Sequence, residues 1–254
     1  MNLASATVVW PVGLGLLGAI VGSFVATLAI RWPAGRSVAR GRSACDGCGR
    51  PLRAWELVPL MSFLVMRGRC ARCGGAIDWL HPGVEALAAA IGCSAGLVAP
   101  GPAAVAGAAF GWLLLALGTI DLLALWLPDR LTLPLALAGL AAGVLGFEPD
   151  LAERLIGGAA GYLSLRLIAW TYRRLRGREG LGGGDAKLLG GIGLWLGWRA
   201  LPAVLFCACF AGLGVVVFRM LTRRRMRGDD VMPLGTLLAL AAYPAWLLMV
   251  GQGA

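Results

Sequence analysis

Four cysteines in one polar stretch of the chain have the type and spacing of metal ligands. Cys45 and Cys48 form one Cys-x-x-Cys pair, Cys70 and Cys73 form a second, and 21 residues separate the pairs. Two thiolates three residues apart on a tight turn reach one metal ion at about 2.3 Å, and the glycine after each pair eases that turn. The pattern predicts a tetrahedral Zn²⁺ site, structural rather than catalytic because four thiolates leave no open position.

A pair of disulfides is the alternative for the same cysteines. Disulfides are rare in the reducing cytoplasm, where the charge pattern described below places this stretch, so zinc is favoured. Residues 31–80 are the only hydrophilic segment of domain size. Because about 50 residues bury too little apolar surface to fold unaided, we expect metal binding to supply most of their folding free energy. The remaining cysteines lie in apolar stretches and are expected to be small buried hydrophobes: Cys93, Cys207 and Cys209.

Two aspartates lie in or beside apolar sequence, where an ionisable group costs about 2.5 to 3.5 kcal/mol to insert into a membrane. Asp121 is embedded in the run Leu-Gly-Thr-Ile-Asp-Leu-Leu-Ala-Leu. Asp185 opens another apolar run and follows three glycines, Gly182, Gly183 and Gly184. Two neighbouring carboxyl groups cannot both ionise cheaply, so one keeps its proton while the other activates a shared water. The pair predicts aspartic-protease chemistry, with a glycine backbone whose unusual dihedral angles let it approach a substrate strand closely.

Several of these polar residues also have a structural interpretation. Asp185 is suited to cap a helix after a glycine hinge, and Asp121 to make a polar contact between helices. Asp129 is expected to cap the helix that follows it. His81, the only histidine, is expected to be an interfacial polar residue. Lys187, the only lysine, is expected to pair with either a lipid phosphate or a carboxylate.

The elements that position these residues are membrane-spanning helices. Hydrophobic residues make up 59% of the 254, charged residues 14%, and the mean hydropathy is +0.78. No soluble fold hides so much apolar surface, and a bilayer core about 30 Å thick needs about 20 apolar residues per helix. We therefore predict an all-α polytopic integral membrane protein with about eight transmembrane helices and a small cytoplasmic zinc-binding loop domain. The predicted spans are residues 7–30, 82–99, 102–125, 131–147, 151–171, 185–198, 200–221 and 232–251.

The basic residues predict the topology. A net charge of +10 would suggest a nucleic-acid partner in a soluble protein, but these arginines gather at alternate helix ends. They lie in residues 31–72, at Arg130, in 173–178 and in 223–227. By the positive-inside rule these connections are cytoplasmic, so both termini face outward and no nucleic-acid partner is expected. The first apolar stretch lacks a basic n-region, and we expect it to be a retained helix rather than a signal peptide.

Together these motifs resemble those of the prepilin peptidases, membrane aspartic proteases of type IV pilus and type II secretion systems. The matching segments are residues 21–24 (Val-Gly-Ser-Phe), the two cysteine pairs with 67–70 (Arg-Gly-Arg-Cys), 81–85 (His-Pro-Gly-Val-Glu), 127–129 (Leu-Pro-Asp), 131–134 (Leu-Thr-Leu-Pro), 179–188 (Glu-Gly-Leu-Gly-Gly-Gly-Asp-Ala-Lys-Leu) and 232–235 (Met-Pro-Leu-Gly). The resemblance implies that Asp121 and Asp185 are the catalytic pair. It implies cleavage of prepilin or pseudopilin leaders on the cytoplasmic side, after a glycine, followed by methylation of the new N-terminus with S-adenosylmethionine.

The resemblance also implies a division of the chain. Residues 1–30 would be the first transmembrane helix, 31–80 the zinc loop associated with methyl transfer, and 81–254 the transmembrane aspartic peptidase domain. Glu85 matches a glutamate of the family and is a candidate for the methyl-transfer site, although a carboxylate near a helix N-terminus is also favourable by itself. Ala26 stands where the family usually has an asparagine, so fewer residues support methyl transfer than cleavage.

Two other classes of function share some of these features. A proton-coupled transporter also buries carboxylates, but the inverted repeats and broken helices expected of one are not visible. A non-enzymatic assembly factor of a secretion system would use the zinc loop for docking and would tolerate loss of both aspartates. For the enzyme we expect the bacterial cytoplasmic (inner) membrane and an active site near its cytoplasmic face. The sequence does not indicate an oligomeric state.

Overall fold

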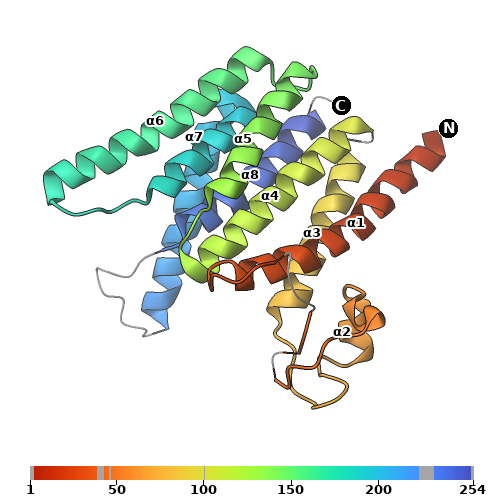
Figure 1. Ribbon diagram of the computed structural model, residues 1–254. Coiled ribbons are helices and arrows are strands. Elements are labelled where there is room, and N and C mark those ends of the chain that lie inside the picture. Colours follow the sequence, from red (N-terminus) through yellow and green to blue (C-terminus); the bar gives the residue numbers. More distant parts are fainter. Residues whose placement is uncertain (1–2, 39–42, 46, 100, 223–231, 253–254) are drawn as a thin grey trace. The chain divides into compact units, whose positions relative to one another are not determined.

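The computed structural model describes residues 3–38, 43–45, 47–99, 101–222 and 232–252. These residues are mostly helical and contain no β-strand, only two isolated β-bridges (Figure 1). The chain divides into two compact units, Met1–Ala116 and Leu117–Ala254.

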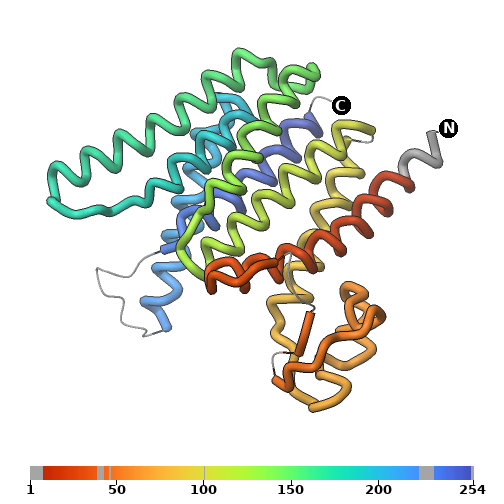
Figure 2. Tube along the Cα trace, in the orientation of Figure 1, coloured from red at the N-terminus to blue at the C-terminus, as the bar shows by residue number. Residues whose placement is uncertain are grey.

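The first unit is built on two long helices that lie side by side, α1 (Leu3–Arg31) and α3 (Leu80–Val98) (Figure 2). Glycines allow this close approach. A Cβ at Gly22 of α1 would lie 2.6 Å from the Cα of Glu85, and a Cβ at Gly96 of α3 would lie 2.5 Å from the nitrogen of Pro11. Small residues at such contacts let helix backbones approach closely in membranes. The cysteine stretch connects the two helices, and its described residues include the 3-10 helix η1 (Ala54–Leu57) and the short helix α2 (Met61–Val65).

The second unit is arranged around α7 (Gly183–Leu221), which contacts α5 (Asp129–Val144), α6 (Leu151–Arg176) and α8 (Leu234–Gln252). The last turns of α4 (Pro102–Ala124) also belong to this unit. Glycines again allow close approach between helices. A Cβ at Gly161 of α6 would lie 2.6 Å from the carbonyl oxygen of Leu189 of α7.

Every predicted span is helical, but two of them form one element. Residues 185–198 and 200–221 are joined in α7, which is interrupted only at Gly197, where φ is 70° and ψ is 177°. Only glycine adopts this conformation without strain. Pro202 follows and cannot donate a hydrogen bond to the preceding turn, so a break here costs little further hydrogen bonding.

Five of the helices in the described part of the chain are long and apolar enough to cross a membrane: Val8–Arg31, Leu80–Val98, Pro102–Ala124, Gly183–Leu221 and Leu234–Gln252. The helix α5 has only 16 residues, and α6 contains Glu153, Arg154 and Arg166. The structure therefore supports an all-helical membrane protein, and the total of eight spans stays a prediction. The basic residues 223–227 used for the topology prediction lie outside the described residues.

One arginine near one end of a predicted span is a core residue. Arg154 of α6 is 2% exposed, and its guanidinium donates hydrogen bonds of 2.8 to 3.1 Å to five backbone carbonyls. These belong to Gly139, Phe147, Glu148, Pro149 and Leu194. Its charge therefore holds the α5–α6 connection against α7 and says nothing about topology.

Candidate active site and candidate metal centre

The two aspartates chosen from the sequence come together in the second unit. Asp121 lies in the last turn of α4 and is 5% exposed, while Asp185 is the third residue of α7 and half-buried. Their carboxyl groups are close enough to interact electrostatically, and both interact with the backbone amide of Gly235. Two carboxyl groups that share one partly enclosed site can divide the roles of acid and base.

The N-terminus of α8 supplies a partner that the sequence interpretation missed. The backbone N–H of Thr236 donates to Oδ2 of Asp121 at 2.8 Å. The hydroxyl of Thr236 lies 3.3 Å from the same oxygen and donates to the carbonyl of Gly118 at 2.8 Å. The first amides of a helix have no partner within the helix and carry partial positive charge, so they suit a carboxylate. The motif at residues 232–235 was recognised in the sequence, but no role was given to it or to Thr236.

Leu127 explains why three separate motifs meet here. Its side chain packs between two glycines, one at the start of α7 and one at the start of α8. A Cβ at Gly184 would lie 2.8 Å from Leu127 Cβ, and a Cβ at Gly235 would lie 2.9 Å from both Leu127 Cδ1 and Asp121 Oδ2. Since real Cβ atoms do not approach so closely, only glycine fits at these two positions without displacing its neighbours.

The role of the glycine triplet differs from the one predicted. Gly182 has a φ of −69°, and neither Gly183 nor Gly184 has a positive φ, so unusual dihedral angles are not the reason for glycine here. Gly182 and Gly183 are exposed, which leaves backbone accessible beside Asp185. The N-cap of α7 is Gly182, so the interpretation of Asp185 as the N-cap residue is wrong.

Asp129 and Lys187 form an ion pair between the starts of α5 and α7. Lys187 Nζ lies 2.6 Å and 2.9 Å from the two carboxylate oxygens of Asp129. The prediction that Asp129 caps α5 is wrong, because Pro128 is the N-cap residue and no side chain caps that end. Of the two partners considered for Lys187, the structure pairs it with a carboxylate. Both side chains are largely exposed, so the pair can contribute little to stability.

The four cysteines of the first unit converge as predicted. Their Sγ atoms all lie within 4.8 Å of one another, and those of Cys45 and Cys73 are 3.8 Å apart. A tetrahedral site with metal–sulfur bonds of about 2.3 Å has edges of about 3.8 Å, so the cluster fits a metal ion. Each pair turns through a glycine of positive φ, whose amide donates to the backbone carbonyl of the first cysteine of the pair: Gly49 to Cys45 at 2.8 Å and Gly74 to Cys70 at 2.9 Å.

A buried ion pair supports this cluster. Both Nη atoms of Arg50 donate to the carboxylate of Glu56, at 3.1 and 2.6 Å, and Glu56 is 5% exposed. These hydrogen bonds hold the pKa of Glu56 below its usual range. Arg50 also reaches Cys70, and hydrogen bonds from the backbone amides of Cys73 and its neighbour lower the pKa of the Cys70 thiol to about 6.

Glu85 belongs to the first unit, whereas both aspartates belong to the second. It is 7% exposed in the second turn of α3, and its Oε2 accepts the backbone N–H of Leu60 at 2.8 Å. Leu60 has a φ of 61°, which is rare for a leucine. Glu85 therefore ties the cysteine stretch to α3. Ala26 on α1 is fully buried, and His81 is half-buried in the first turn of α3.

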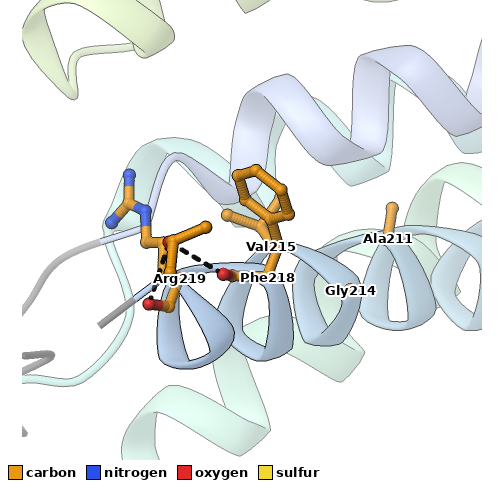
Figure 3. Close-up of a pocket in the computed structure, with 6 residues that line it drawn as sticks. Ala211, Gly214, Val215, Phe218 and Arg219 are labelled. Carbon is orange, nitrogen blue, oxygen red and sulfur yellow. Dashed lines mark hydrogen bonds between the residues drawn. The ribbon is translucent and has the colours of Figure 1, made fainter. Parts of the chain in front are cut away.

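A surface hollow of about 660 Å³ lies along the last turns of α7 (Figure 3). Asp185 is in the first turn of the same helix. Apart from Arg219 and Thr222 its lining is apolar, and the hydroxyl of Thr222 bonds to the carbonyls of Phe218 and Arg219. The hollow contains none of the candidate site residues. Its lining residues are Ala211, Gly214, Val215, Phe218, Arg219 and Thr222.

Comparison with known proteins bears on both centres. Residues 16–98 match the family model of the bacterial peptidase A24 N-terminal domain, and residues 108–217 match that of the type IV leader peptidase family. A protein of Burkholderia pseudomallei (strain 1026b) is 44% identical over 82% of this chain and 67% of its own length. One of Dickeya chrysanthemi is 38% identical over 96% of this chain and 91% of its own. One of Pseudomonas aeruginosa is 36% identical over 91% of this chain and 88% of its own length.

All three relatives carry the name prepilin leader peptidase/N-methyltransferase. No solved structure matches the chain.

Proposed function

The chain belongs to the type IV leader peptidase family, and from this premise we propose that Asp121 and Asp185 hydrolyse the peptide bond between a prepilin leader and its mature pilin. The protein is an inner-membrane enzyme that cleaves prepilin leader peptides and N-methylates its product. The transporter and assembly-factor alternatives are not favoured by this membership.

The observation that carries the proposal is the position of both carboxyl groups at the N-terminus of α8. Asp121 accepts the amide hydrogen of Thr236, and the amide of Gly235 faces both aspartates. We assign the carboxylate to Asp121, because the helix terminus offsets its negative charge, and the shared proton to Asp185.

In the proposed reaction Asp121 removes a proton from a water molecule as its oxygen attacks the scissile carbonyl carbon. Asp185 donates its proton to the carbonyl oxygen, which gives a neutral tetrahedral diol. That intermediate collapses when Asp121 passes its proton to the leaving amine nitrogen, the carbon–nitrogen bond breaks, and one hydroxyl proton returns to Asp185. The products are the leader carboxylic acid and the pilin amine, and both aspartates regain their starting forms.

The exposed backbone at Gly182 and Gly183 would receive the substrate strand beside Asp185, and Gly184 leaves room for Leu127 next to the site. The test is to incubate the detergent-solubilised protein with a prepilin and to identify the cleavage products by mass spectrometry. Asp121→Asn and Asp185→Asn should each abolish leader release, because the pair acts as one unit. Asp129→Asn, whose carboxylate pairs with Lys187, should cleave normally. Activity in either of the first two variants would overturn the assignment.

The second activity is proposed to depend on the first unit. Cys45, Cys48, Cys70 and Cys73 would hold Zn²⁺, which supplies folding free energy and has no open coordination position. Methyl transfer would use S-adenosylmethionine, with Glu85 as a candidate residue near that site. The test is whether the mature pilin gains the mass of one methyl group only when S-adenosylmethionine is present. Loss of this mass gain in Glu85→Gln would support the role of Glu85.

The remaining assignments concern the arrangement of the chain in the membrane. We propose that the cysteine stretch and both aspartates face the cytoplasm and that both termini lie outside. We also propose that the substrates are prepilins or pseudopilins. The functional division is 1–30 for the first span, 31–80 for the zinc loop and 81–254 for the peptidase. The topology is tested by placing single labelling sites in the connections and measuring which of them react with a membrane-impermeant reagent in inverted and in right-side-out vesicles.

A further inference from the structure

Apolar side chains along one part of the cysteine stretch are left exposed. They lie on η1, on α2 and on the residues between them, which we call the 55–65 segment. Their exposed fractions run from 43% to 70%. Soluble surfaces rarely expose so many large apolar groups side by side, and such patches mark contact with a partner or a membrane. The residues are Trp55, Leu57, Val58, Met61, Leu64 and Val65.

The 55–65 segment is tied to the beginning of the candidate membrane-spanning helix α3. Leu60 donates its backbone N–H to Glu85, five residues after the start of α3. At 1.5 Å per residue this point lies about 7.5 Å along the helix from Leu80. Trp79, 76% exposed, immediately precedes α3, where tryptophan commonly marks the membrane–water interface. Figure 1 shows α2 beside this end of α3, so the apolar segment lies level with the first turns of the span.

The charges around the 55–65 segment suit an anionic surface. Four exposed arginines flank it: Arg53, Arg67, Arg69 and Arg72. Glu56 is turned inward to Arg50. Among the described residues from 43 to 79, Asp78 is the only exposed acidic side chain. Basic residues beside exposed apolar groups are the composition of segments that lie in the plane of a membrane containing anionic lipids.

We propose that the 55–65 segment is an in-plane membrane anchor: its apolar side chains insert into the leaflet in which α3 begins, and the flanking arginines contact anionic lipid headgroups. The anchor holds the cysteine cluster against the membrane surface, where a substrate N-terminus leaves the bilayer. This inference does not depend on the assignment of the catalytic aspartates.

The full-length protein in phosphatidylethanolamine/phosphatidylglycerol vesicles, with a trace of phospholipid carrying a diazirine in its acyl chain, tests the proposal. Trypsin cleaves after Arg53 and Arg67, so the segment is recovered as one peptide, residues 54–67. The preceding peptide, residues 43–53, contains the first cysteine pair and serves as the internal control, because trypsin does not cut between Arg50 and Pro51. We expect lipid adducts on 54–67 at several times the level on 43–53.

Variants separate insertion from general proximity to lipid. Leu64→Asp/Val65→Asp should lose most of the adduct on 54–67 while bound zinc is retained, and Ala76→Asp, at an exposed position after the second cysteine pair, should keep it. Equal labelling of both peptides, or undiminished labelling of the double variant, would overturn the proposal. The proposal would also be overturned if residues 54–67 carried no lipid adduct and instead photocrosslinked to a prepilin. That result would make the segment a substrate-docking surface.

Discussion

Substitution of Gly235 by alanine tests the active-site geometry without touching a carboxyl group. The new Cβ would lie 2.9 Å from Asp121 Oδ2 and from Leu127 Cδ1, whereas ordinary contacts begin at 3.4 Å, so these groups must move by 0.5 Å or more. A misplacement of about 1 Å in a catalytic group costs on the order of 10²-fold in rate, so we expect kcat for leader cleavage to fall by about 10- to 100-fold.

The assay is release of leader from a prepilin under saturating substrate, with thermal unfolding of the same samples. Alanine in place of glycine in a helix otherwise stabilises by about 0.5 to 1 kcal/mol, so stability should change little while activity falls. Gly214→Ala in α7, where a Cβ would meet nothing within 4 Å, is the matched control and should cleave normally. Wild-type activity in a folded Gly235→Ala protein would refute the role of Asp121 at the start of α8.

Four further outcomes follow from the described contacts. Arg154→Ala leaves five backbone carbonyls without their donor, at about 1 to 3 kcal/mol for each one that stays buried, so we expect a loss of at least about 3 kcal/mol in denaturant unfolding; an unchanged midpoint would contradict this. Chelation of bound metal should unfold the cysteine stretch, seen as rapid proteolysis at residues 43–79, and a protease-resistant apo protein would exclude a structural metal. Glu56→Gln should speed the removal of metal by a chelator at neutral pH but not in acid. Because Arg50 lowers the pKa of Glu56, the ion pair stabilises the folded cysteine stretch above about pH 4, and this stabilisation is lost as the pH falls through the lowered pKa of Glu56. Lys187→Met should cost less than about 1 kcal/mol, since its pair with Asp129 is exposed, and a larger loss would show an unseen partner.

Residues with strong chemical preferences could be predicted from the sequence. An aspartate in an apolar run costs free energy to bury unless a polar group contacts it, and two Cys-x-x-Cys pairs have the spacing of ligands for one metal ion. The types and spacing of these residues therefore indicated the two centres. The helices were predicted for a similar reason, since apolar runs of span length have few other stable forms. The motif at residues 232–235 was visible, but its function was not.

Residues that act through the backbone could not be predicted. The shortest contact of Thr236 with Asp121 is made by its backbone amide, which every residue but proline possesses, so that contact left no signal in the residue type. Arg154 looked like any charge near a helix end until its five carbonyl partners were seen. Gly184 was assigned unusual dihedral angles, whereas its lack of a side chain makes room for Leu127.

Composition and motif spacing alone determined that this chain is a helical membrane protein with a candidate thiolate cluster and a pair of buried carboxyl groups, because hydrophobic length and ligand spacing are properties of short segments. The tertiary structure decided which backbone amides face those carboxyl groups, that α7 continues through a break at Gly197, and that Glu85 ties the cysteine stretch to α3. These contacts join residues far apart in the chain, and they depend on how closely helices approach at glycine, which no local pattern specifies.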